Sequence, residues 1–188
     1  MCSSDLSPGG PFIFLGQPNV KEQAYARDLG VDHFVYGWQN AYGKKEDNDK
    51  KSMGTTEYAR TQGAIAITLE CGQHNNADNI DIGYNAIDRA LRHFNLIKQQ
   101  NIISNNNSPQ QTCIKMKDVF YKTENSKWTQ EWKNFDFVQK EQPLIKLSNG
   151  NTINAKEDGY IILPKDTQEI GTAWLYFGIK TDFPNSNN

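Results

Sequence analysis

The feature that most constrains the fold is a continuous apolar run that leads through a polar turn into an amphipathic helix. The run, Ala64–Leu69, is partly β-branched and predicts a central strand buried on both faces. Glu70 ends it, and apolar residues then recur at spacings of four and three. They are Ile80, Tyr84, Ile87, Leu91 and Phe94. This pattern predicts a helix over about 78–96 with one face on a sheet, as in α/β folds.

The preceding residues repeat the alternation of strand and helix. A strand is predicted at Pro11–Leu15, between glycines, and a second at His33–Tyr36. Between them Asn19 is predicted to cap a helix, with Glu22 as its capping-box partner and Gly30 as its stop. We therefore interpret residues 7–97 as an α/β unit.

Residues 38–54 are polar and include a charged run from Lys44 to Lys51. Such a run predicts a solvated loop, and its length and position suggest a lid as a further hypothesis. Thr55 or Thr56 is predicted to cap a short helix that continues through Thr61 and is ended by Gly63.

The second half of the chain has a different pattern. Residues 98–111 are rich in Asn, Gln and Ser and predict a linker. Beyond them, short apolar segments separated by turns predict a small all-β domain at 112–181 and a frayed tail at 182–188. The predicted strands are Ile114–Tyr121, Phe135–Val138, Leu144–Leu147, Tyr160–Leu163 and Trp174–Ile179.

Composition excludes several classes of protein. A formal net charge of -2 argues against a nucleic-acid-binding protein, and the absence of an 18-residue apolar run argues against a membrane span. The three cysteines, Cys2, Cys71 and Cys113, do not form a disulfide framework or a zinc-site spacing. Together with the lack of a signal peptide, they lead us to expect a cytoplasmic protein.

Two charged residues near the apolar run are candidates for chemistry. A carboxylate such as Glu70 at the end of a buried strand is partly desolvated, which moves its pKa toward that of a general base. The alternative is a Glu that caps the following turn or pairs with an Arg. Arg60 is predicted to reach the same mouth of the sheet and to bind a substrate carboxylate, unless it is simply a surface residue of its helix.

The histidines and Cys71 are weaker candidates. His74 is interpreted as a turn residue or as a support behind the site rather than as a metal ligand, because no second His is near it. His33 and His93 are expected to be structural. A thiolate at Cys71 is disfavoured by the adjacent Glu70.

The segment Tyr58-Ala59-Arg60-Thr61-x-Gly63, followed by Ile65 through His74, resembles the succinylglutamate desuccinylase/aspartoacylase family. The resemblance continues into the helix Ile80–Leu96 and, more loosely, includes Pro11–Phe14 and Leu163-Pro164-Lys165. It implies a zinc-carboxypeptidase-like α/β domain, of which this chain holds the C-terminal portion, followed by the β domain.

The resemblance also implies a reaction. Such enzymes are zinc hydrolases that cleave amide bonds of small N-acyl amino acids, with the metal held by a His-x-x-Glu pair and a later His. By this match Glu70 is the general base and proton shuttle, and Arg60 binds the substrate carboxylate. The resemblance also allows a homo-oligomer.

The sequence departs from the family in one respect, since it contains no His-x-x-Glu motif and therefore no metal ligands. Residues 1–6, Met-Cys-Ser-Ser-Asp-Leu, match the translation of a common sequencing adapter, so we expect them to be a cloning or assembly scar. We therefore expect a fragment that is inactive by itself, marginally soluble or self-associating. The alternatives are a non-catalytic protein of the same fold that binds carboxylate ligands and, last, a β module that docks partners.

Overall fold

The computed structural model describes residues 9–16, 19–38, 54–72, 76–98, 111–166 and 169–183. The helices are α1 (Val20–Asp28), α3 (Thr55–Thr61) and α4 (Asp78–His93). The strands before the predicted linker are β1 (Phe12–Phe14), β2 (His33–Tyr36) and β3 (Thr68–Glu70). Those after it are β4 (Thr112–Tyr121), β5 (Lys127–Trp128), β6 (Phe137–Val138), β7 (Pro143–Lys146), β8 (Thr152–Asn154), β9 (Gly159–Ile162) and β10 (Ala173–Thr181).

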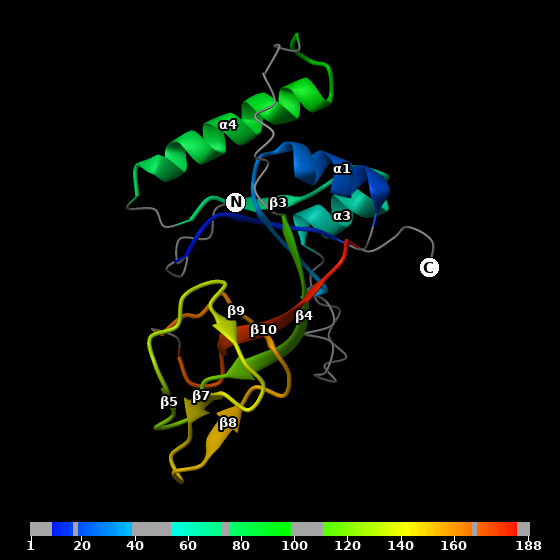
Figure 1. Ribbon diagram of the computed structural model, residues 1–188. Helices are drawn as coiled ribbons and strands as arrows, with labels where there is room; N and C mark the ends of the chain where they lie inside the picture. The colour runs from blue at the N-terminus through cyan, green and yellow to red at the C-terminus, as the bar shows by residue number, and fades with distance from the viewer. Residues whose placement is uncertain are drawn as a thin grey trace.

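A mixed seven-stranded sheet runs through the molecule in the order β3-β1-β2-β4-β10-β9-β6. β1, β2 and β4 are parallel, whereas β3 runs antiparallel to β1 and β10 antiparallel to β4. The helices gather at one end and a small second sheet, β5-β7-β8, lies at the other, with the long strands β4 and β10 between them (Figure 1). The expected α/β class with a mixed sheet is confirmed.

The sheet joins the two halves of the chain that differ in sequence pattern. β4, which follows the predicted linker, pairs with β2 from the first half, so hydrogen bonds cross between the halves. One apolar cluster likewise combines Phe12 and Val35 with Ile114, Ile162 and Tyr176. The division into an α/β unit at 7–97 and a β domain at 112–181 remains a prediction, and these shared contacts tie the two parts together.

Helix α1 begins where the sequence predicts. Asn19 is its N-cap, and the Asn19 side chain accepts a hydrogen bond from the backbone N–H of Lys21 at 2.9 Å. Glu22 does not act as the expected capping-box partner. Its carboxylate instead accepts a hydrogen bond from the backbone N–H of Gly16 and pairs with Arg60, because the helix is turned so that Glu22 is buried.

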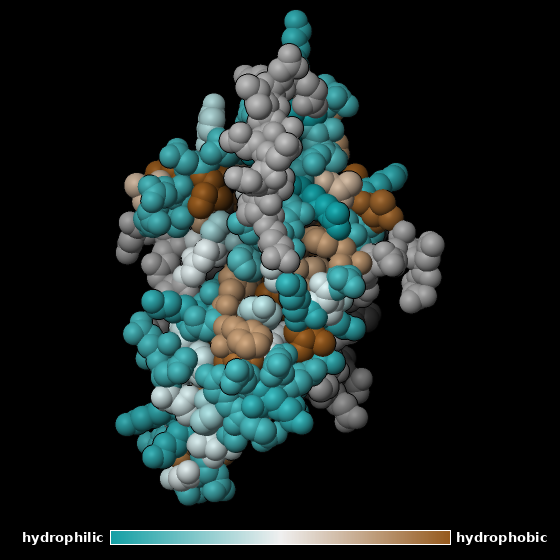
Figure 2. Space-filling view, viewed as in Figure 1, coloured by the Kyte–Doolittle hydropathy of each residue, from teal (hydrophilic) through white to brown (hydrophobic). Residues whose placement is uncertain are grey.

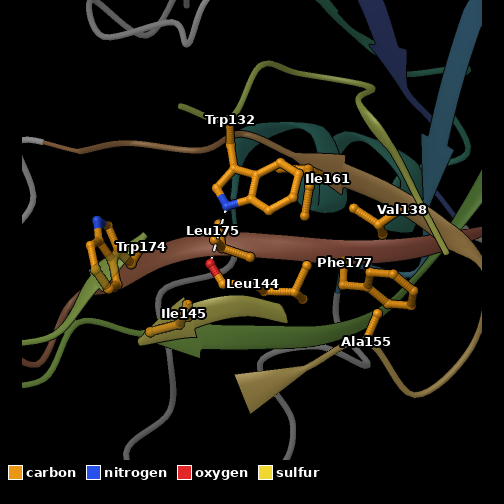
Figure 3. Packing of buried hydrophobic residues seen from close by; sticks show 9 residues of the cluster. All are labelled: Trp132, Val138, Leu144, Ile145, Ala155, Ile161, Trp174, Leu175 and Phe177. Atoms are coloured by element: carbon orange, nitrogen blue, oxygen red, sulfur yellow. Dashed lines mark hydrogen bonds between the residues drawn. The ribbon is translucent and has the colours of Figure 1, made fainter. Parts of the chain in front are cut away.

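The β-rich half has a core of its own, in which Trp132 and Trp174 are each 1% exposed. The indole N–H of Trp132 donates a hydrogen bond to the carbonyl oxygen of Leu144 at 3.2 Å (Figure 3). The other buried members shown there are Val138, Ile145, Ala155, Ile161, Leu175 and Phe177. Because side chains from both sheets meet in this core, the short strands β5, β7 and β8 are held against the long ones.

Two expectations from the opening feature are wrong. The run Ala64–Leu69 is not a central strand: only its end belongs to β3, which is the edge strand of the sheet among the described residues. The amphipathic helix does form, but its large apolar side chains do not pack on the sheet. Ile80, Tyr84 and Ile87 are 74%, 71% and 64% exposed, and the helix is instead buried at Ala86 and Arg92.

Within the described residues, no helix is long and apolar enough to cross a membrane.

Candidate functional site

Glu70 lies at the carboxyl end of β3, as predicted. It does not lie beside the carboxyl end of the neighbouring strand, where the sites of parallel sheets form. Because β3 is antiparallel to β1, Glu70 is opposite Phe12, at the amino end of β1. Phe12 is in turn paired with His33 at the start of β2. Residues paired across a sheet project on the same face, so Glu70, Phe12 and His33 form one row on that face.

The Glu70 carboxylate is buried without full compensation. The residue is 6% exposed, and its Oε2 atom accepts no hydrogen bond from any described residue. Burial raises the pKa of Glu70, and the positive charge of Lys165 opposes that rise. A buried acceptor without a partner is costly, so its presence in a folded protein calls for an explanation.

Arg60 lies at the end of α3 and is held by two carboxylates. Its Nε atom is 2.6 Å from Glu22 Oε1, and its Nη1 atom is 3.0 Å from Glu57 Oε1. Its Nη2 atom donates to the carbonyl oxygen of Ala66. The guanidinium therefore binds side chains of its own chain, and with 19% of its side chain exposed Arg60 is not the simple surface residue that the sequence offered as the alternative.

Arg60 and Glu70 have different neighbours along the segment that contains β1, and their meeting at one mouth of the sheet stays a prediction. The Arg60 side chain packs against Gly16, where an added Cβ atom would clash with Arg60 Nε. Gly16 is four residues beyond Phe12, the partner of Glu70. At the rise of an extended chain, the backbones at these two points are about 13 Å apart. This separation is longer than the three-residue strand β3.

The remaining predicted residues are placed as follows. His93 Nδ1 is 2.6 Å from Asp28 Oδ2 and its ring contacts Tyr25, so His93 joins α4 to α1 as a structural residue. Cys71 is partly buried directly after Glu70. His74, the expected scar at 1–6, the Lys44–Lys51 run and most of the 98–111 linker lie outside the described residues.

Sequence reasoning missed two residues near Glu70. Lys165 is close enough for its charge to act on Glu70, although 95 positions separate them in the chain. His33 stacks on Phe135, with ring centroids 4.2 Å apart and planes at 10°, and Phe135 also contacts Phe12. The only signal in the sequence was the loose match at Leu163-Pro164-Lys165, because topology rather than spacing brings these segments together.

The described residues do not fit a metal site. No group of three or more His, Cys, Asp or Glu side chains lies together among them in an arrangement that would hold an ion. Three or four such ligands are what a protein zinc site requires. Glu70 offers a carboxylate and Lys165 a positive charge to a ligand, but the described residues provide no zinc site around them.

Solved structures share this fold. A succinylglutamate desuccinylase/aspartoacylase from Rhodobacter sphaeroides superposes with a TM-score of 0.66 at 12% identity over 95% of this chain. Succinylglutamate desuccinylase from Vibrio cholerae gives a TM-score of 0.67 at 13% identity over 99% of this chain. The product-bound ectoine utilization protein EutE from Ruegeria pomeroyi gives 0.61 at 13% identity over 95%. No protein-family model and no curated protein matches the sequence.

In each comparison, the matched share of this chain is larger than the matched share of the solved chain. Nearly all of this chain is matched, but it covers 55%, 53% and 55% of the three solved chains, respectively. The chain thus spans about half their length. Over that half, it has the fold of the succinylglutamate desuccinylase/aspartoacylase structures.

Proposed function

We propose that this chain is part of a hydrolase that cleaves the amide bond of small N-acyl amino acids, with Glu70 as the general base. The observation that carries the proposal is the buried, unpartnered Glu70 oxygen at the edge of a desuccinylase/aspartoacylase fold. Acyl transfer to water needs a group that removes a proton from the nucleophile and returns it to the leaving amine. A carboxylate with a raised pKa suits both steps.

In this proposal, residues of the chain also bind and orient the substrate, in addition to transferring a proton. Lys165 is near Glu70 and provides a positive charge for a substrate or for the negative charge that develops on the carbonyl oxygen. Arg60 remains the predicted partner of a substrate carboxylate. Because Glu22 and Glu57 now hold it, such binding would require Arg60 to release at least the half-buried Glu57.

Zinc is part of the proposal only for the complete protein. When bound, it would supply a Lewis acid and a more acidic water. The described residues hold no ligand cluster, so its ligands would lie outside them, and we assign no step to the metal here. For the same reason we expect the 188-residue chain alone to be inactive.

Hydrolysis assays test this function. The 188-residue chain and the protein expressed from its reading frame extended upstream are each incubated with zinc and a panel of N-succinyl and N-acetyl amino acids. We expect turnover only by the extended protein, and a loss of about 10²-fold or more in kcat with Glu70→Gln. The matched control is Glu169→Gln, because Glu169 is an exposed carboxylate far from β3 in the chain. Equal turnover by both variants would remove Glu70 from the mechanism.

The absence of a ligand cluster among the described residues favours one alternative, a non-catalytic protein that binds carboxylates. Titration calorimetry of the 188-residue chain with N-acetylaspartate and succinate distinguishes it. Metal-independent binding that is lost in Arg60→Met and retained in the control Arg89→Met would favour the alternative. No binding by the chain, with turnover by the extended protein, favours the hydrolase.

A further inference from the structure

The arginine predicted to bind a substrate carboxylate already contacts two carboxylates of its own chain. Arg60 Nε is 2.6 Å from Glu22 Oε1, and Arg60 Nη1 is 3.0 Å from Glu57 Oε1. Two negative charges therefore face one positive charge. Because like charges repel, a carboxylate from a ligand is expected to replace one of the two rather than to join both.

Glu22 is the carboxylate that is fixed in place. Its side chain is 2% exposed. Besides Arg60, it accepts hydrogen bonds from the backbone N–H groups of Gly16 at 3.2 Å and Ala66 at 3.4 Å. Displacement of Glu22 from Arg60 would leave a buried carboxylate without its cation, which is strongly unfavourable. Glu22 therefore holds the guanidinium in position whether or not a ligand is bound.

Glu57 is held more weakly. Its side chain is 35% exposed, and it lies three residues before Arg60 on α3, an arrangement whose ion pairs stabilise a helix only slightly. Its other carboxylate oxygen accepts a hydrogen bond from the hydroxyl group of Thr56 at 3.0 Å. Hydrophilic side chains make up most of the described surface in the view of Figure 2, so a carboxylate released at the surface stays in a polar setting. Glu57 is thus the carboxylate that can leave Arg60 at low cost.

We propose that Glu57 occupies the ligand position of Arg60 when no substrate is bound, and that a substrate carboxylate binds by displacing Glu57 while Glu22 keeps the guanidinium in place. Glu57 contacts Arg60 and not the reacting atoms, so it is a positioning residue that sets the affinity for carboxylates. A neutral amide accepts weaker hydrogen bonds from a guanidinium than a carboxylate does, so it would not displace Glu57. The exchange therefore also selects against ligands that lack a free carboxylate.

This inference rests on the proposed function in one respect, because both assign a substrate carboxylate to Arg60. It adds no step to the hydrolysis. The substrate carboxylate stays on Arg60 in the ground state and in the transition state, so Glu57 opposes both equally. Removal of the Glu57 carboxylate is therefore expected to lower KM and to leave kcat unchanged.

Nuclear magnetic resonance of the Arg60 side chain in the 188-residue chain tests the exchange, with acetate as the probe. Acetate offers one carboxylate and nothing else, so at millimolar concentrations it reports this contact apart from the rest of a substrate site. The N–H signals of Arg60 are followed during titration of the wild type and of Glu57→Gln. We expect saturable shifts whose midpoint is about 2- to 5-fold lower in Glu57→Gln, as for loss of a partly exposed ion pair.

Two controls accompany the titration. Glu131→Gln removes an exposed carboxylate from the β-rich half and should keep the wild-type midpoint. Acetamide has nearly the same size as acetate but no charge, and it should leave the Arg60 signals of both proteins unchanged.

Three results would overturn the proposal. The first is an acetate midpoint that is the same in the wild type and in Glu57→Gln, or Arg60 signals that do not respond in either. The second is a large fall in the melting temperature of Glu57→Gln, which would make Glu57 a fixed part of the structure. The third is hydrolysis of N-acyl amino acids by a protein containing this chain with a KM that Glu57→Gln leaves unchanged, which would spare the proposed function. A lower midpoint in Glu57→Gln without any hydrolysis would retain the exchange and refute only the proposed reaction.

Discussion

Glu70 combines burial, an unpartnered oxygen and a raised pKa in one side chain, and these three properties have a consequence for stability. A carboxyl group whose pKa is higher in the folded state stabilises the fold while it is protonated. That contribution is complete below the ordinary pKa of Glu and is lost as pH rises through the raised value. The cost of the buried charge is therefore present at neutral and alkaline pH.

We predict that Glu70→Gln raises the melting temperature of the 188-residue chain at about pH 8 by a few degrees and leaves it unchanged at about pH 4. Thermal unfolding followed by circular dichroism at both pH values measures this. Glu169→Gln, at an exposed position, should have no effect at either pH. A gain for Glu70→Gln that is the same at both pH values would show that packing, and not the charge, is responsible.

The ion pair between Arg60 and Glu22 is the second feature at the residue scale. The Glu22 side chain is 2% exposed, so removal of Arg60 leaves a buried charge without its partner. We predict that Arg60→Met lowers the free energy of unfolding by about 3 kcal/mol in urea titrations. Arg89→Met, at a more exposed arginine with one 3.4 Å hydrogen bond, should cost about 0.5 kcal/mol or less. The double variant Arg60→Met/Glu22→Leu should recover much of the loss; a double variant as unstable as Arg60→Met alone would contradict this account.

At the scale of elements, the core around Trp132 holds the second sheet to the first. Trp132→Ala removes a fully buried indole and its hydrogen bond to Leu144 and should cost about 3–5 kcal/mol. The control is Phe137→Ala, because Phe137 is 52% exposed and should cost about 1 kcal/mol or less. Urea unfolding followed by tryptophan fluorescence and by circular dichroism gives both values. Similar losses for the two variants would show that this cluster does not stabilise the sheet contact.

Local patterns predicted which elements form, and long-range pairing decided how they are arranged. Asn19 caps α1 and β2 lies where the local pattern placed it, because these signals act over a few residues. α3 ends at Thr61 as predicted, but its N-cap is Gly54 rather than Thr55 or Thr56. The short strands β5 and β8 carried no such signal and were missed. The apolar face of α4 was predicted correctly as a face, but its partner could not be, since periodicity does not reveal what covers a helix.

The sequence likewise predicted one residue of the candidate site but not its neighbours. Glu70 stood out because it ends an apolar run, and its burial agrees with that reading. The approach of Lys165 and the row with Phe12 and His33 depend on an antiparallel β3, which no local pattern indicated. The engagement of Arg60 by Glu22 likewise depends on the rotation of α1.

At the scale of the whole molecule, a continuous sheet runs from the β-rich core at one end to β3 at the other, and no described strand pairs with the outer edge of β3. It spans about half of each solved structure with which it shares its fold. Our central claim is the proposed function: this chain is part of a longer hydrolase in which Glu70 is the general base and further polypeptide supplies the metal ligands.

The most direct test of this claim is to sequence the source DNA upstream of codon 7. We predict that the reading frame continues and encodes a His-x-x-Glu motif and a later His, in a segment about as long as this chain. An in-frame stop codon followed by a genuine start at Met1 would contradict the claim. The protein would then lack these metal ligands by nature, and the carboxylate-binding alternative would take the place of the hydrolase.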